Sequence, residues 1–179
     1  LLLAIILLVS TPCFAERMSV EQIMSSSCRI SVQHCEKANC GRSHWGSGGT
    51  IEEDDSNYYV LTVGHIFYGN LNKFYDGPIY VEYFYAGKSV GKVLANLVFI
   101  EFDDKDGSCI DLAMLSVAKS QMQNTPSVIR LENPKFNIPV GTEVFSSSSP
   151  HASNTRYFKA NIIQSDAYKY VVNTRYIDG

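Results

Sequence analysis

A histidine and an aspartate stand at the ends of two apolar segments of this sequence. His65 follows the apolar residues 58–63 and Gly64, and Asp111 comes directly before the apolar residues 112–117. A carboxylate that lies against a core strand needs a polar partner, and an imidazole is a suitable one. An imidazole held by a carboxylate can take up and return a proton, which is the chemistry of general acid-base catalysis. We therefore expect His65 and Asp111 to form a functional pair, although a histidine with a purely structural role would fit the first segment alone.

Short strands dominate the secondary structure that the sequence predicts. Six apolar or alternating segments, each bounded by Gly, Asn, Asp or Ser, are expected as strands at residues 29–33, 45–52, 58–63, 78–85, 88–101 and 112–117. Strands at this spacing favour an all-β fold with a closed barrel, which we place at residues 28–119. Ahead of the barrel, residues 16–27 form a leader segment, in which Val20, Ile23 and Met24 stand at the spacing of a brief helix.

A second series of strands is expected after the barrel. Residues 120–127 are rich in Gln, Asn, Pro and Ser and are predicted to be a linker. Residues 128–179 then form a second unit, with predicted strands at 127–131, 142–146, 156–163 and 169–173.

The first residues are typical of the later part of a secretory signal peptide, without its charged start. Residues 1–9 are apolar, and small residues stand three and one positions before a cut after Ala15. The apolar run is far shorter than the roughly 20 residues that span a bilayer. We therefore expect cleavage after residue 15 and a secreted or periplasmic product, with no membrane contact after cleavage.

The composition fits a globular product: 45% of the residues are hydrophobic, 18% are charged, and the net charge is −3. No strongly basic or acidic balance points to a nucleic acid or a membrane surface as partner. Acidic residues cluster at 52–55 and 103–106, between apolar runs. Neither cluster has the spacing of a known calcium loop, so solvated turns are favoured over calcium binding.

Four cysteines remain after cleavage at Ala15, and an even number in an exported chain predicts disulfides. They are Cys28, Cys35, Cys40 and Cys109. Three pairings are possible, and one between Cys35 and Cys40 would close a small loop. A zinc site that combines the first three cysteines with His34 and His44 is the alternative, but the segment lacks a Cys-x-x-Cys pair.

Three segments around His65 and Asp111 resemble the trypsin-like serine peptidases of the chymotrypsin fold. Residues 46–51 (GSGGTI), 60–65 (VLTVGH) and 111–115 (DLAML) are similar to that family's glycine-rich strand, histidine motif and aspartate motif, in the same chain order. The resemblance implies two six-stranded antiparallel β-barrels, the second incomplete here, a polypeptide substrate, and no metal or organic cofactor. In that family the histidine is the general base and the aspartate orients it.

Two departures qualify the resemblance. Ile66 and Phe67 follow His65 where animal digestive members carry a bridged cysteine, which is nearer to the bacterial, chaperone-protease-like or phage-encoded branch. The family's nucleophile lies in a Gly-x-Ser-Gly-Gly motif, and residues 176–179 are similar to the residues just before that motif. Gly179 would then be its first glycine and an oxyanion-hole donor. We expect the chain to be truncated before its nucleophile, and residues 16–179 to be inactive alone.

The sequence also allows alternatives for the nucleophile, the function and the fold. Ser47 and the serines at 146–149 are weak candidates for the nucleophile, because the first belongs to the glycine-rich strand and the others lack neighbouring glycines. An inactive homologue that acts as a binding module, and a cysteine nucleophile on the same fold, are the two rivals. An unrelated β-sandwich would hold His65 and Asp111 more than about 6 Å apart. Arg175 would favour an acidic residue at the cleaved position, unless it is simply exposed.

Overall fold

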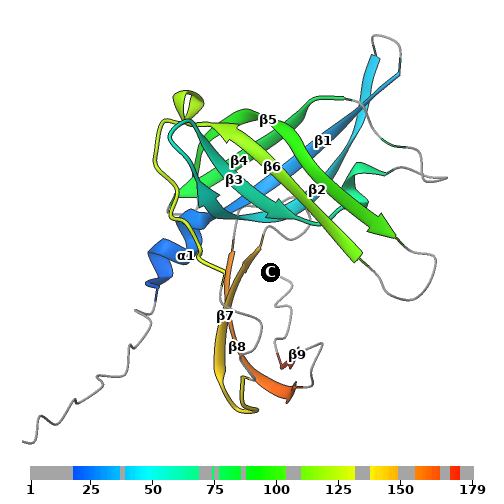
Figure 1. Ribbon diagram of the computed structural model, residues 1–179. Helices are drawn as coiled ribbons and strands as arrows, with labels where there is room; N and C mark the ends of the chain where they lie inside the picture. Colours follow the sequence, from blue (N-terminus) through cyan, green and yellow to red (C-terminus); the bar gives the residue numbers. More distant parts are fainter. Residues whose placement is uncertain are drawn as a thin grey trace, which may run out of the picture.

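A closed barrel of six antiparallel strands forms the larger part of the structure, and a three-stranded sheet lies beside it (Figure 1). The structure is a computed structural model, which describes residues 18–36, 39–68, 74, 77–85, 88–103, 110–131, 138–148, 156–165 and 170–173. The barrel strands are β1 (Ser27–Glu36), β2 (Asn39–Glu53), β3 (Asn57–Thr62), β4 (Ile79–Tyr85), β5 (Lys88–Asp103) and β6 (Ile110–Ala118). The six predicted strands and the closed barrel are thus confirmed.

The order of the strands around the barrel is β1-β2-β3-β6-β5-β4, and β1 pairs with β4 to close it. Strands β3 and β6 are therefore neighbours although β4 and β5 separate them in the sequence. Their register sets Leu61 opposite Met114 and Thr62 opposite Ala113. This pairing brings the end of β3, just before His65, beside the start of β6, where Asp111 stands.

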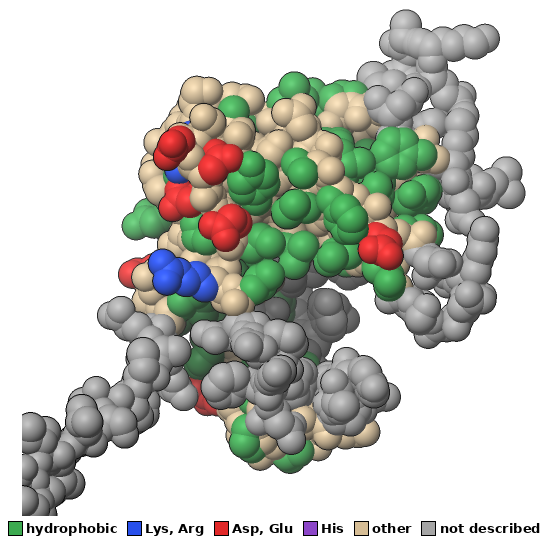
Figure 2. Space-filling view, viewed as in Figure 1, with side chains coloured by type: hydrophobic (Ala, Val, Ile, Leu, Met, Phe, Trp, Pro, Cys, Tyr) green, Lys and Arg blue, Asp and Glu red, His purple; other side chains and the backbone are tan. Residues whose placement is uncertain are grey.

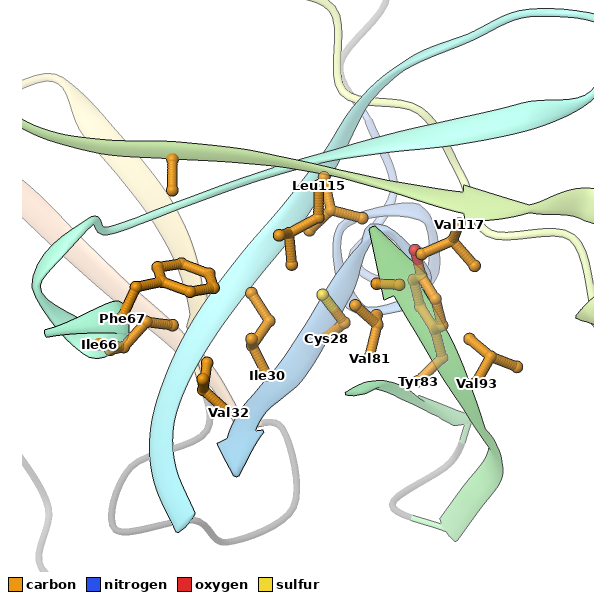
Figure 3. Packing of buried hydrophobic residues seen from close by; sticks show 13 residues of the cluster. Cys28, Ile30, Val32, Ile66, Phe67, Val81, Tyr83, Val93, Leu115 and Val117 are labelled. Atoms are coloured by element: carbon orange, nitrogen blue, oxygen red, sulfur yellow. The ribbon is translucent and has the colours of Figure 1, made fainter. Parts of the chain in front are cut away.

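The barrel interior is filled by alternate residues of each strand, as the period of a β-strand requires. Figure 3 shows Cys28, Ile30 and Val32 of β1 pointing into the same core as Leu115 and Val117 of β6. Ile30, Val32, Leu115 and Val117 are fully buried. Burial of this apolar area is the main contribution that stabilises the barrel.

Cys28 corrects the disulfide prediction. It is a free cysteine, 1% exposed, and it lies among the apolar side chains of the barrel core. Its position two residues before Ile30 on β1 turns it inward, where it stays unpaired within the core. Cys35 and Cys40 stand opposite each other in the β1–β2 register, but their side chains lie outside the described residues, as does Cys109.

The glycine-rich part of β2 lets the strands pack closely. A Cβ atom on Gly48 would lie 2.7 Å from Ile30 Cδ1 and 2.8 Å from Val60 Cγ1. Gly49 faces the other side of the strand, where a Cβ atom would meet Ile129 Cδ1 at an ordinary 3.6 Å. Gly48 is therefore required by the core, and Gly49 is not.

The second sheet consists of β7 (Glu143–Ser148), β8 (Arg156–Ser165) and β9 (Tyr170–Val172), in that order. Three of the four strands predicted for this half are confirmed. The described residues after 131 form this sheet, and a second barrel stays a prediction.

The predicted strand at residues 127–131 is wrong. The Ile129 amide donates a hydrogen bond to the Thr50 carbonyl at 2.8 Å, where the β2–β3 pairing is irregular between Thr50 and Glu52. Thr50 lies just past the end of the β1–β2 pairing, which stops where Ser27 stands opposite Gly49, and this backbone hydrogen bond alone does not make a ladder.

Helix α1 (Val20–Ser26) connects the barrel to the second sheet, and it is shorter than the predicted segment at residues 16–27. The carbonyl of Ile23 accepts hydrogen bonds from the hydroxyls of Ser27, at 2.8 Å, and Ser147 on β7, at 3.4 Å. Ser25 at the same end contacts Ser127 at 2.7 Å. None of the described helices is long and apolar enough to cross a membrane.

Candidate active site

His65 is held at the end of β3 by a short 3-10 helix, η1 (His65–Phe67). The two residues after it, Ile66 and Phe67, are 2% and 0% exposed and anchor η1 in the barrel core. Ile66 packs against β2, where a Cβ atom on Gly46 would lie 3.0 Å from Ile66 Cδ1. Ile66 and Phe67 therefore hold the loop by packing, while the His65 side chain remains 58% exposed.

Gly64 is required immediately before the histidine. A Cβ atom at this position would lie 3.1 Å from the Glu101 carbonyl oxygen and 3.3 Å from the Leu112 carbonyl oxygen. These oxygens belong to the backbone of β5 and β6, which cannot move aside without disturbing the barrel. The glycine thus lets the chain pass close to the start of β6, and this approach brings His65 to Asp111.

Asp111 receives two hydrogen bonds from His65. The ring atom Nδ1 lies 2.7 Å from Asp111 Oδ2, and the backbone amide of His65 donates to Asp111 Oδ1 at 2.8 Å. Asp111 pairs with Phe102 of β5 in the register, on the inward side of β6 but at the open end of the barrel. Its carboxylate is therefore fixed by the fold at both oxygens.

The surroundings of Asp111 favour its ionised form. Partial burial alone would raise its pKa, but the hydrogen bonds from the His65 ring and amide, the charge of His65 and the Gly64 amide together lower it below its ordinary value. Asp111 is therefore a carboxylate at neutral pH. An ionised carboxylate accepts hydrogen bonds and cannot donate them, so Nδ1 of His65 carries the hydrogen of their contact.

This tautomer leaves Nε2 of the neutral ring with a free lone pair. The exposed imidazole can accept a proton at Nε2, and the carboxylate at Nδ1 stabilises the imidazolium that results. His65 and Asp111 can therefore act together as a general base followed by a general acid.

The structure brings together His65 and Asp111 of the predicted site residues. Gly179 and Arg175 lie outside the described residues. Among the described residues, no serine hydroxyl forms a hydrogen bond with the His65 ring. The backbone carbonyl of Ser47 accepts a hydrogen bond from the Thr62 hydroxyl at 2.9 Å, and the Ser147 hydroxyl contacts that of Ser27.

A pocket of about 310 Å³ lies between the barrel and β7, lined by Ile23, Ser47, Leu61, Ile129 and Phe145 among others. His65 does not line this pocket.

In the part of the chain that the structure describes, no three His, Cys, Asp or Glu side chains gather to hold a metal ion. Of the acidic residues at 52–55, the first two end β2, and Asp54 begins the bend that follows, where it accepts hydrogen bonds from the amides of Ser56 and Asn57, both at 2.7 Å.

Sequence reasoning missed the backbone donors at this site. The amides of Gly64 and His65 both favour the Asp111 carboxylate, so the loop orients the aspartate as much as the aspartate orients the ring. Backbone amides carry no residue signature, but the glycine that immediately precedes the histidine indicates a close approach of two segments of the backbone.

No protein-family model matches the chain, and no curated protein has a significant similarity to it.

Proposed function

We propose that the protein is a serine-type endopeptidase of the chymotrypsin fold, in which His65 and Asp111 form the proton-transfer part of the catalytic triad. The observation that carries this proposal is the 2.7 Å contact between His65 Nδ1 and Asp111 Oδ2, next to an exposed ring. The closed six-stranded barrel and the order of the three sequence motifs also support it.

In the proposed reaction a serine hydroxyl attacks the carbonyl carbon of a peptide bond. His65 Nε2 takes the hydroxyl proton as the oxygen–carbon bond forms, and it then gives this proton to the leaving amine as the carbon–nitrogen bond breaks. Asp111 stabilises the imidazolium in between. Water then hydrolyses the acyl-enzyme with the same proton transfers in the same order. By the resemblance, the serine follows residue 179, and the Gly179 amide contributes to the oxyanion hole.

The test is casein hydrolysis by the full-length gene product, compared with its His65→Ala variant. Loss of a triad member typically lowers kcat by roughly 10⁴-fold or more, so hydrolysis should fall at least a thousandfold. His44→Ala is a matched control, because His44 stands opposite Val32 in the β1–β2 register, outside the β3–β6 pairing that sets His65 beside Asp111, and its loss should leave the rate within about a factor of two. Turnover that persists in a folded His65→Ala variant would refute the proposal. A folded, inactive wild type would favour the binding-module reading.

A further inference from the structure

The outer face of strands β5 and β6 exposes a group of large apolar side chains. Val98 and Phe99 of β5 are 50% and 42% exposed, and Ile110 and Leu112 of β6 are 42% and 38% exposed. Phe99 stands opposite Met114, and Met114 stands opposite Leu61 of β3, which extends the group across three strands. We call these six residues the β5–β6 face. Figure 2 shows hydrophobic side chains gathered over these strands. Contiguous exposed apolar residues of this kind mark interaction sites.

Glu101 places a carboxylate within this face. Glu101 points outward opposite Leu112, between the row of Phe99 and the row of Ile110. Within the described part of the chain its carboxylate has no hydrogen-bond or ion-pair partner, and no described Lys or Arg stands on the outward positions of β3, β5 and β6 beside it. The face therefore offers apolar contacts together with the negative charge of Glu101.

The face also adjoins the candidate active site. Leu112 directly follows Asp111, and the carbonyl oxygens of Glu101 and Leu112 flank Gly64, the residue before His65. A polypeptide that extends from the active site across this end of the barrel would meet the face without any rearrangement.

The closed barrel decides how such a polypeptide could bind. Glu101 and Leu112 are paired with each other across β5 and β6, and their side chains project from the outer face, so a ligand that lies on this face is held by side chains. Outward residues of one strand repeat at about 7 Å, which is also the spacing of alternate side chains in an extended peptide. An extended segment can therefore match the rows of Phe99 and Glu101 with successive outward side chains of its own.

We propose that the β5–β6 face binds an extended segment of the polypeptide substrate in which apolar side chains flank a Lys or Arg at alternate positions. The apolar side chains of this segment contact Phe99, Val98 and Leu112, and its basic side chain pairs with Glu101. The inference rests on the proposed function only where it names the bound segment as part of a substrate.

The test is a fluorescence polarisation titration with the full-length chain carrying His65→Ala, so that binding is measured without cleavage. The probe is a labelled nonapeptide in which leucine alternates with serine around a central lysine, and its twin has glutamate in place of the lysine. We expect the lysine peptide to bind at least about threefold more tightly than its twin, with the difference shrinking at high salt.

Variants identify the face that binds. Glu101→Lys should reverse the preference between the two peptides, whereas Glu52→Lys, a charge reversal at an exposed site on β2, should keep it. Phe99→Ser should weaken both peptides at least threefold, whereas Leu94→Ser, at a 48% exposed apolar site farther along β5, should not. Thermal unfolding of each variant verifies that it is folded.

Equal binding of the twins to the wild-type face, or a preference that survives Glu101→Lys, would overturn the inference. So would a chain that dimerises through Phe99 in sedimentation velocity and no longer binds peptide, since a second copy would then occupy the face. Failure of the proposed function appears separately, as casein hydrolysis that does not depend on His65.

Discussion

At the scale of single residues, the site depends on how one loop holds one carboxylate. Both oxygens of Asp111 accept hydrogen bonds from His65, one from the ring and one from the backbone amide. The pair is therefore mutual: the ring is oriented by the carboxylate, and the carboxylate is oriented by the loop that carries the ring. A change in either partner should be detectable in the titration of the other.

His65→Ala should raise the pKa of Asp111. The variant removes the ring hydrogen bond and the ring charge, which lower that pKa in the wild type, and leaves the backbone amides. Carboxyl carbon shifts in an NMR titration measure the change. Asp54 is an internal control, because hydrogen bonds from Tyr59, Ser56 and Asn57 lower its pKa to about 2 independently of His65. If the pKa of Asp111 is the same in His65→Ala and in the wild type, the His65 ring does not stabilise the carboxylate.

The lowered pKa of Asp111 in the wild type also makes the stability of the fold depend on pH. Because the folded pKa of Asp111 lies below the unfolded value, its ionised form stabilises the fold above the unfolded pKa of about 3.9. This contribution is lost as the pH falls through the folded pKa. The free energy of unfolding of His65→Ala, measured against pH, should therefore lose less on the acid side than that of the wild type.

At the scale of the elements, β2 is shaped by one glycine that faces the core. Gly48→Ala would force a methyl group to within 3 Å of Ile30 and Val60 side chains and should destabilise the protein by about 1–3 kcal/mol. Gly49→Ala faces Ile129 at an ordinary contact distance and should change the stability by less than about 0.5 kcal/mol. Urea unfolding of both variants tests this difference, and equal losses would refute the assignment of the two faces.

The elements also show what local sequence could and could not predict. Gly and Asp boundaries and alternating apolar residues identify the six barrel strands, because each strand has one buried face. Residues 127–131 carry the same apolar signal and form no strand, although the Ile129 amide donates a hydrogen bond to the Thr50 carbonyl just past the end of the β1–β2 pairing. Whether an apolar segment forms a ladder depends on how segments far away in the sequence are placed beside it, and a local pattern does not contain that information.

The pairing of His65 with Asp111 could be expected because both stand at ends of apolar strands and need polar partners. The fate of Cys28 could have been found from its alternation with Ile30 and Val32, which are also inward residues of β1. The even number of cysteines predicted disulfides without regard to the direction of each side chain, and so the inward position of Cys28 was overlooked.

At the scale of the whole molecule, the barrel core encloses a reactive group that reports on unfolding. Burial raises the pKa of the Cys28 thiol, and the side chain is 1% exposed. Maleimide labelling at pH 8, followed by peptide mass spectrometry, should leave Cys28 unmodified in the native protein and modify it in guanidinium chloride. Rapid native labelling of Cys28, or its recovery in a disulfide-linked peptide, would contradict the closed core.

The central claim is that Asp111 holds His65 as the general base of peptide hydrolysis, and the most direct test is the kinetics of Asp111→Asn in the full-length gene product. The asparagine keeps the size of the side chain but removes the charge that stabilises the imidazolium and fixes the ring tautomer. With a fluorogenic peptide that the wild type cleaves, we expect kcat to fall by roughly 10⁴-fold while KM changes little. A folded Asp111→Asn variant with kcat within tenfold of the wild type would contradict the claim.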